Sequence, residues 1–156
     1  MHVSASVGQD LAKRAACAFV FSAQPSMTAT ADSAAASTAL PPPDGYLPLF
    51  RTSPFLVLNG PFFYKPNSPS GDLSQGFSIG FRVGPQHLNA KGSMHGGLYA
   101  TVADVALGYV TAAARPAGDK RLTTNLSLDY VADAREGDWL DVEVNILKNG
   151  RRLAVA

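Results

Sequence analysis

Apolar and polar side chains alternate in two stretches of the second half of the chain, Leu73 to Val83 and Leu122 to Val131. A period of two places every second side chain on the same face, so both stretches are predicted to be strands with one buried face. Trp139 to Leu147 is expected to form a third strand. Asn149-Gly150, which follows it, is a strong hairpin signal.

A longer segment, from His95 to Ala114, is apolar on nearly every side and carries one charge, Asp104. Its length and composition predict a helix that is buried all round. Gly108 inside this helix is less favourable than alanine by about 1 kcal/mol, and the close approach of another backbone would account for it. Arg115-Pro116 is expected to end the helix.

The elements follow in the order strand, long helix, then strands in a meander, which predicts an α+β fold with one helix packed on an antiparallel sheet. Phe50 to Tyr64 is interrupted by two prolines and is expected to cover the core, with a short extended piece from Pro61 to Tyr64. After the Asn-Gly turn, Arg151 to Ala156 is short for its partner strand. We therefore expect the domain to be truncated at its C-terminal strands, although a short edge strand is the alternative.

The first third of the chain is rich in Ala, Ser and Pro and poor in large apolar residues, and it ends in a linker-like run, Pro41 to Gly45. Such a segment buries too little surface to offset its ordering entropy. Residues 1–45 are therefore predicted to be a mostly disordered tail and residues 46–156 the folded domain. Lys13-Arg14 before a short apolar run is a weak secretory signal, and Met27 is an alternative start.

The composition excludes several classes of protein. The formal net charge of +1 gives no overall attraction to nucleic acid or to an acidic membrane surface. No apolar run reaches the roughly 18 residues that a membrane span requires. The single cysteine, Cys17, rules out an internal disulfide framework, and the chain is expected to be cytoplasmic. The sequence contains neither a phosphate-binding loop, nor a dinucleotide fingerprint, nor a serine nucleophile elbow.

Asp104 is the first candidate for chemistry. A buried carboxylate is unfavourable unless it is paired, and burial raises the pKa of a carboxyl group, which suits a general base near neutral pH. The alternative is a structural aspartate that caps or bonds a neighbouring helix.

Gly96 and Gly97 open the helix, where free N–H groups and the positive end of the helix dipole meet. A ligand carbonyl could approach these amides closely, or the glycines could simply form the turn. The side-chain amide of Asn89 could donate to the same oxygen, or it could bond its own loop. Thr123 could position a water molecule, or it could be an ordinary strand residue.

The helix geometry separates the two candidate groups. Eight residues at about 1.5 Å each place Gly96 and Asp104 roughly 12 Å apart, too far to act on one carbonyl. A second copy of the helix, running antiparallel and close at Gly108, would bring them together. The sequence therefore predicts a twofold dimer with its sites at the interface.

Histidines near the helix start raise the question of a metal site. His87 and His95, with one acid and no nearby cysteine, do not make a convincing metal-binding set. His95 is expected to brace the loop or to contact a ligand, and no metal or redox cofactor is predicted.

At these residues the chain resembles the hotdog-fold acyl-CoA thioesterases of the phenylacetate-degradation type, in the 4-hydroxybenzoyl-CoA thioesterase superfamily. The resemblance covers roughly Pro54 to Ala156. Its most specific part is Asn89-x-x-Gly92-x-x-His95-Gly96-Gly97 followed by Ala103-Asp104, and it is supported by Leu126-x-Leu128-x-Tyr130 and Gly137-Asp138.

The resemblance implies a long helix wrapped by an antiparallel sheet, in a homodimer or a dimer of dimers. It implies that Asp104 acts as general base or nucleophile, while Gly96 and Asn89 from the opposite subunit hold the thioester oxygen. Thr123 falls where some relatives carry a serine that orients water. The implied reaction is the hydrolysis of an acyl-CoA to a carboxylic acid and CoA. A non-catalytic acyl-CoA-binding module and an enoyl-CoA hydratase are the alternatives.

The same resemblance gives candidates for substrate contacts. The acyl chain is expected between helix and sheet, and the coenzyme phosphates are expected at basic residues, although such residues are usually only solvated. The substrate-binding candidates are His95, Gly97, Tyr99 and Arg121, with Phe81, Tyr109, Lys120, Arg151 and Arg152 as further contacts.

Overall fold

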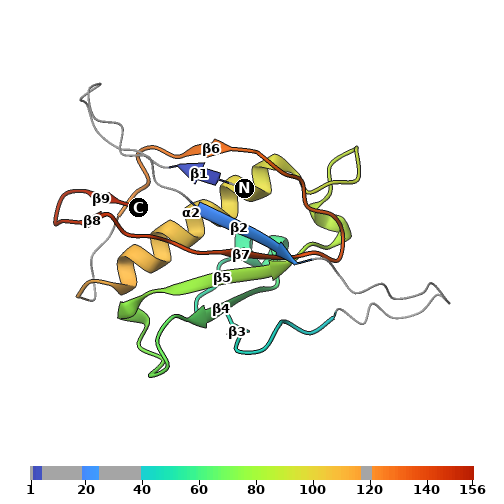
Figure 1. Ribbon diagram of the computed structural model, residues 1–156. Coiled ribbons are helices and arrows are strands. Elements are labelled where there is room, and N and C mark those ends of the chain that lie inside the picture. The colour runs from blue at the N-terminus through green and yellow to red at the C-terminus, as the bar shows by residue number, and fades with distance from the viewer. Residues whose placement is uncertain (1, 5–18, 25–39, 117–120) are drawn as a thin grey trace.

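The computed structural model describes residues 2–4, 19–24, 40–116 and 121–156. It confirms the predicted α+β class: the long helix α2 (Gly96–Ala113) lies across one face of an antiparallel sheet (Figure 1). A shorter helix, α1 (Pro54–Asn59), and two single-turn 3₁₀ segments, η1 (Leu73–Gln75) and η2 (Pro85–His87), complete the helical structure of these residues. None of the described helices is long and apolar enough to span a membrane.

Seven strands form the sheet, and every pairing in it is antiparallel. In spatial order they are β3 (Leu47–Pro48), β4 (Phe62–Pro66), β5 (Phe77–Arg82), β7 (Trp139–Val142), β2 (Phe19–Gln24), β1 (His2–Ser4) and β6 (Ser127–Asp129). A separate hairpin joins β8 (Lys148–Asn149) to β9 (Ala154–Val155).

The core lies between α2 and the centre of the sheet. The predicted apolar face of β5 is confirmed, since Phe77, Ile79, Phe81 and Val83 are all buried. From the helix, Val102, Ala103 and Ala106 are fully buried and belong to the same cluster. Large strand residues and small helix residues therefore meet, and the helix axis lies close to the sheet.

The described residues leave the opposite side of α2 uncovered, which corrects the prediction of a helix buried all round. Gly97, Asp104 and Gly108 are exposed and recur at the spacing of one helix face. A Cβ atom built on Gly108 would meet nothing within 4 Å, so no backbone of the described chain approaches it. The apolar composition of the helix does not by itself show that the chain covers both sides.

The second face of β5 is also buried, where the alternation led us to expect a polar, exposed face. Ser78 is buried, and a Cβ atom at Gly80 would lie 2.4 Å from the Trp139 ring. Tyr46 packs edge-on against Trp139 at 4.9 Å between ring centroids. Arg82 donates to the Pro41 carbonyl over 2.9 Å. The segment that precedes β3 therefore covers this part of the sheet.

The predicted meander is wrong, because β6 and β7 are not neighbours. β7 pairs with β5 and β2, whereas β6 pairs with β1. Both strands are also shorter than predicted from Leu122 to Val131 and from Trp139 to Leu147. The chain forms strand structure there only where a partner strand lies alongside. Leu122, expected on a buried face, precedes β6 and is 92% exposed.

A small part of the first 45 residues, for which a mostly disordered tail was predicted, belongs to the described sheet, and the extent of a disordered tail stays a prediction. β1 and β2 come from this part of the chain and bridge β7 and β6. The remaining positions up to 39, among them Cys17 and Met27, lie outside the described residues. The boundary at residue 46 and the expected loss of C-terminal strands stay predictions.

Two local elements follow from capping and turn chemistry. α1 was not predicted, although Ser53 and Pro54 form a recognisable start: the Ser53 hydroxyl accepts from the Leu56 N–H over 3.3 Å, and proline occupies the first turn.

The hairpin signal at Asn149-Gly150 is confirmed. The loop is longer than a two-residue turn, since Asn149 still pairs with Ala154.

Candidate active site

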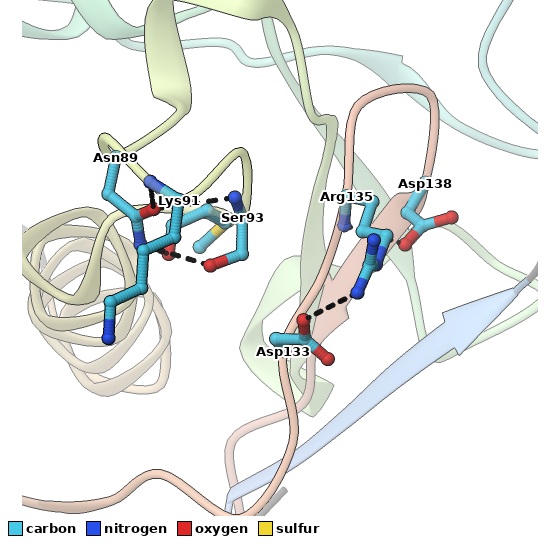
Figure 2. Close-up of polar contacts among 7 residues, drawn as sticks. Asn89, Lys91, Ser93, Asp133, Arg135 and Asp138 are labelled. Carbon is cyan, nitrogen blue, oxygen red and sulfur yellow. Dashed lines mark hydrogen bonds and ion pairs between the residues drawn. The ribbon is translucent and has the colours of Figure 1, made fainter.

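The loop before α2 is organised by the side chain of Asn89 (Figure 2). Its Oδ1 accepts from the Lys91 N–H over 2.8 Å, and its Nδ2 donates to the Ser93 hydroxyl over 3.0 Å. A weaker contact joins Nδ2 to the Met94 carbonyl at 3.5 Å. These contacts match the alternative of an asparagine that bonds its own loop, and a role as substrate donor stays a prediction.

This loop is held in place by the turn that precedes β7. The Met94 N–H donates to the Ala134 carbonyl over 2.8 Å, and Ser93 forms a bridge with Arg135. The turn is closed in its own right, because the Arg135 N–H donates to the Asp138 carboxylate over 2.9 Å (Figure 2). The start of α2 is therefore fixed from outside the helix.

The two glycines at the helix start have different surroundings. His95 caps the helix, with its Nδ1 accepting from the Gly97 N–H over 2.9 Å. The Gly96 N–H has no hydrogen-bond partner within the described residues. The Gly96 carbonyl accepts from the Tyr130 hydroxyl over 3.1 Å. Only Gly96 thus keeps an amide free for an incoming oxygen, at the positive end of the helix dipole.

Asp104 is paired with Thr123. The Thr123 hydroxyl donates to Asp104 Oδ1 over 2.5 Å, across an interval of 19 residues between α2 and the segment before β6. Both residues are exposed, so the part of the chain that the structure describes does not provide the predicted burial of Asp104. The cause is the uncovered side of α2, on which this carboxylate lies.

The Asp104–Thr123 pair and the Gly96 amide lie at separate places on one chain. Asp104 and Gly96 are eight residues apart on the same helix, which is roughly 12 Å along the helix axis. One chain therefore presents a carboxylate with a positioned hydroxyl at one point and a free amide at another. Among the described residues, no group of three histidine, cysteine or acidic side chains is placed to hold a metal ion.

The expected acyl-chain contacts lie mostly in the core. Tyr99 is 4% exposed and packs edge-on against Tyr130, and its burial raises the pKa of its phenol. Phe81 is fully buried. Tyr109 is half-buried and lies near Phe50 and Arg51. These side chains fill the space between helix and sheet.

Arg121 lies at a cavity of about 350 Å³ beside the C-terminal half of α2. Its guanidinium donates to the Gly150 carbonyl over 2.8 Å. Thr123, Arg151 and Arg152 line the same cavity, whereas Lys120 lies outside the described residues.

Tyr130 is the site-adjacent residue to which the sequence pattern assigned no role. Its hydroxyl bonds the first residue of α2 while its ring meets Tyr99, so β6 and the helix start are joined. The alternation through Leu128 and Tyr130 was recognised, but alternation alone does not say which helix terminus a strand residue reaches.

Comparison with known proteins gives the class of this chain. A family model described as the thioesterase superfamily matches residues 91–156, a range that includes Gly96, Asp104 and Thr123 and begins just after Asn89. A Pseudomonas aeruginosa protein provisionally named as an esterase is 42% identical over 73% of this chain and 81% of its own length. The chain belongs to the thioesterase superfamily, and its long helix on an antiparallel sheet is the hotdog fold.

Two further relatives match over shorter ranges. A Caenorhabditis elegans protein, also provisionally named as an esterase, is 39% identical over 44% of this chain and 40% of its own length. The acyl-coenzyme A thioesterase 13 of Mus musculus is 31% identical over 48% of this chain and 53% of its own length. No solved structure gives a significant match.

Proposed function

We propose that the protein hydrolyses acyl-CoA thioesters to a free carboxylic acid and CoA, at sites formed between two copies of the chain. The hydrogen bond between Thr123 and Asp104, on the uncovered side of α2, carries this proposal. Membership of the thioesterase superfamily supports the reaction, and the name of the mouse relative supports the substrate class.

Asp104 acts as the general base. The Thr123 hydroxyl donates to one carboxylate oxygen, which fixes the carboxylate and leaves the other oxygen to accept a proton from water. The water oxygen forms a bond to the thioester carbon, the C–S bond breaks, and the thiol leaves with a proton. Thr123 is a positioning residue for Asp104. The Asp104 carboxylate could also attack the thioester carbon directly, as a nucleophile, in a variant of this mechanism.

The partner copy supplies the group that stabilises the developing oxyanion. In an antiparallel pair of α2 helices, the Gly96 N–H of one copy faces Asp104 of the other. This register places the crossing of the two helices near Ala100, midway between Gly96 and Asp104, and not at Gly108 as the sequence led us to expect. Asn89 could add a second donor if its amide releases the long contact with Met94. The partner would also cover Asp104 and remove it from bulk water.

Substitution of the carboxylate tests the proposal. Asp104→Asn keeps the size of the side chain and its contact with Thr123, but the amide cannot accept a proton from water. Thiol release from a panel of aliphatic and aromatic acyl-CoAs should fall by about 100- to 10,000-fold. Asp129→Asn, at an exposed acid on β6, is the matched control and should keep the wild-type rate.

The assay also distinguishes the alternatives. A wild-type rate in Asp104→Asn would contradict the assignment of the base. Binding of acyl-CoA by the wild-type protein without release of thiol would point instead to a binding module. Loss of the C=C absorbance of an enoyl-CoA, without release of thiol, would point to a hydratase.

A further inference from the structure

The first two residues of α2 need outside support. Gly96 and Gly97 lack Cβ atoms, so their backbone torsions are the least restricted in the helix. Gly96 also carries the N–H group that has no partner among the described residues. An amide that stabilises an oxyanion must point at the place where the charge develops, within about 3 Å of it. Other groups must therefore hold these glycines in one conformation.

Two side chains hold the peptide that joins the glycines. The Gly97 N–H at one end of this peptide donates to His95 Nδ1 over 2.9 Å, and the Gly96 carbonyl at the other end accepts from the Tyr130 hydroxyl over 3.1 Å. A peptide is a rigid plane, so contacts at both ends fix its orientation and with it the conformation of Gly96. The preceding peptide, which carries the free N–H, is held through the His95 carbonyl, which accepts from the Leu98 N–H over 2.9 Å.

Tyr130 is itself held close to Gly96. It follows β6 directly, and its ring packs edge-on against the buried Tyr99 at 5.9 Å between centroids. A Cβ atom at Gly96 would lie 3.6 Å from the Tyr130 ring, so the ring lies against the glycine. The phenol has one proton to donate, and the Gly96 carbonyl accepts it. Tyr130 therefore acts on the backbone of Gly96 and not directly on a substrate oxygen.

One segment of the chain reaches both candidate groups on α2. Thr123 donates to the Asp104 carboxylate, and Tyr130, seven residues later, donates to the Gly96 carbonyl. In the proposed dimer, Gly96 of one copy faces Asp104 of the other. Thr123 and Tyr130 of one chain then serve different sites.

We infer that Tyr130 is a positioning residue for the oxyanion-binding amide of Gly96, and that it acts in the site whose carboxylate belongs to the partner copy. The inference rests on the proposed function for the reaction and for the pairing of the helices. It adds a residue to the site and says which of the two subunits supplies it.

Removal of the phenol hydroxyl is the first test. Tyr130→Phe keeps the ring against Gly96 and Tyr99 but loses the bond to the Gly96 carbonyl. With an acyl-CoA substrate, kcat should fall by roughly 10-fold, because a misaligned amide stabilises the transition state less well. KM should change by less than about twofold, because the loss concerns the transition state and not the bound substrate. Tyr64→Phe removes a phenol hydroxyl from β4 and is the matched control, which should keep both constants.

A mixed dimer tests which subunit Tyr130 serves. One copy carries Asp104→Asn and the other carries Tyr130→Phe, and different affinity tags allow the mixed dimer to be isolated. If the inference holds, one of its two sites combines an intact Asp104 with an intact Tyr130, and the dimer should show about half the wild-type kcat. If Tyr130 acts with the Asp104 of its own chain, neither site is intact, and the mixed dimer should be slower than the Tyr130→Phe homodimer. That result would overturn the inference.

The two proposals can fail separately. Loss of activity in Asp104→Asn, with a wild-type kcat in Tyr130→Phe, would overturn the inference and leave the proposed function standing. If the wild type releases no thiol, the proposed function fails, and binding then decides the inference. The probe is a trifluoromethyl ketone analogue of the acyl-CoA, whose tetrahedral hydrate imitates the transition state. Calorimetry should show roughly 10-fold weaker binding to Tyr130→Phe than to the wild type. Equal binding, or no binding by either protein, would reject the inference.

Discussion

His87 shows how a single side chain can link two segments of the fold. The Gly84 N–H donates to its Nδ1 over 2.9 Å, so Nε2 carries the proton and donates to the Asn59 carbonyl over 3.0 Å. The ring is buried and packs edge-on against Phe81. His87 therefore joins the end of α1 to the turn after β5 as a neutral imidazole, and it is not available as a metal ligand.

The burial of His87 makes stability depend on pH. Burial lowers the pKa of this imidazole below its usual 6.5, so the unfolded chain takes up a proton more readily than the folded chain. The contribution of His87 to the free energy of unfolding should be complete above about pH 6.5 and should decrease as the pH falls toward the folded-state pKa. Urea unfolding of the wild type and of His87→Gln between pH 5 and 8 measures this contribution as their difference. A difference that stays constant over this range would refute the prediction.

At the scale of single residues, the sequence identified the types of side chain in the site better than their surroundings. Asp104 and Thr123 were both proposed, and they are in contact in the structure. The burial of Asp104 was inferred from an apolar helix, but composition does not say which side its own chain covers. Asn89 fitted two roles equally, because an amide donates equally well to a loop oxygen and to a ligand.

Among the elements, α2 offers the most direct test of the interface. Ala100 lies midway between Gly96 and Asp104, so two antiparallel helices that bring these residues together cross at Ala100. Ala100→Leu should push the helices apart and weaken dimerisation, which sedimentation equilibrium measures. Gly108→Ala is the matched control: it should add about 1 kcal/mol to the helix and leave association unchanged, because a Cβ atom there meets nothing within 4 Å among the described residues. Unchanged association in Ala100→Leu would exclude a close helix contact at this position.

The elements that the sequence predicts best are those defined by their own residues. α2 was bounded correctly because an apolar run of this length begins at a glycine pair and ends before Arg115-Pro116. The strands around β6 and β7 were predicted too long, because their ends depend on where a partner strand stops. α1, with only six residues, lacks enough turns to show a helical period.

At the scale of the whole molecule, the sheet depends on two strands from the N-terminal segment. β2 pairs with β7, β1 pairs with β6, and together they connect the two parts of the sheet. Ala23→Pro removes a backbone N–H opposite Leu140 and should lower the free energy of unfolding by roughly 1–3 kcal/mol.

Thermal unfolding measures this effect, with Ala23→Val as the matched control that keeps the N–H and favours a strand. A proline variant as stable as the valine variant would show that β2 contributes little to the sheet. The pairing partners of β1 and β2 could not be predicted from the sequence, because the local alternation of apolar and polar residues does not identify a distant partner strand.

This strand order has a consequence for biosynthesis. Phe21 pairs with Val142, about 120 positions further along the chain, so the earlier strand has no partner until about 120 more residues have been made. At typical elongation rates the wait is on the order of ten seconds. Such high contact order slows folding and leaves an unpaired strand exposed meanwhile, so the nascent polypeptide is a natural client for chaperones at the ribosome.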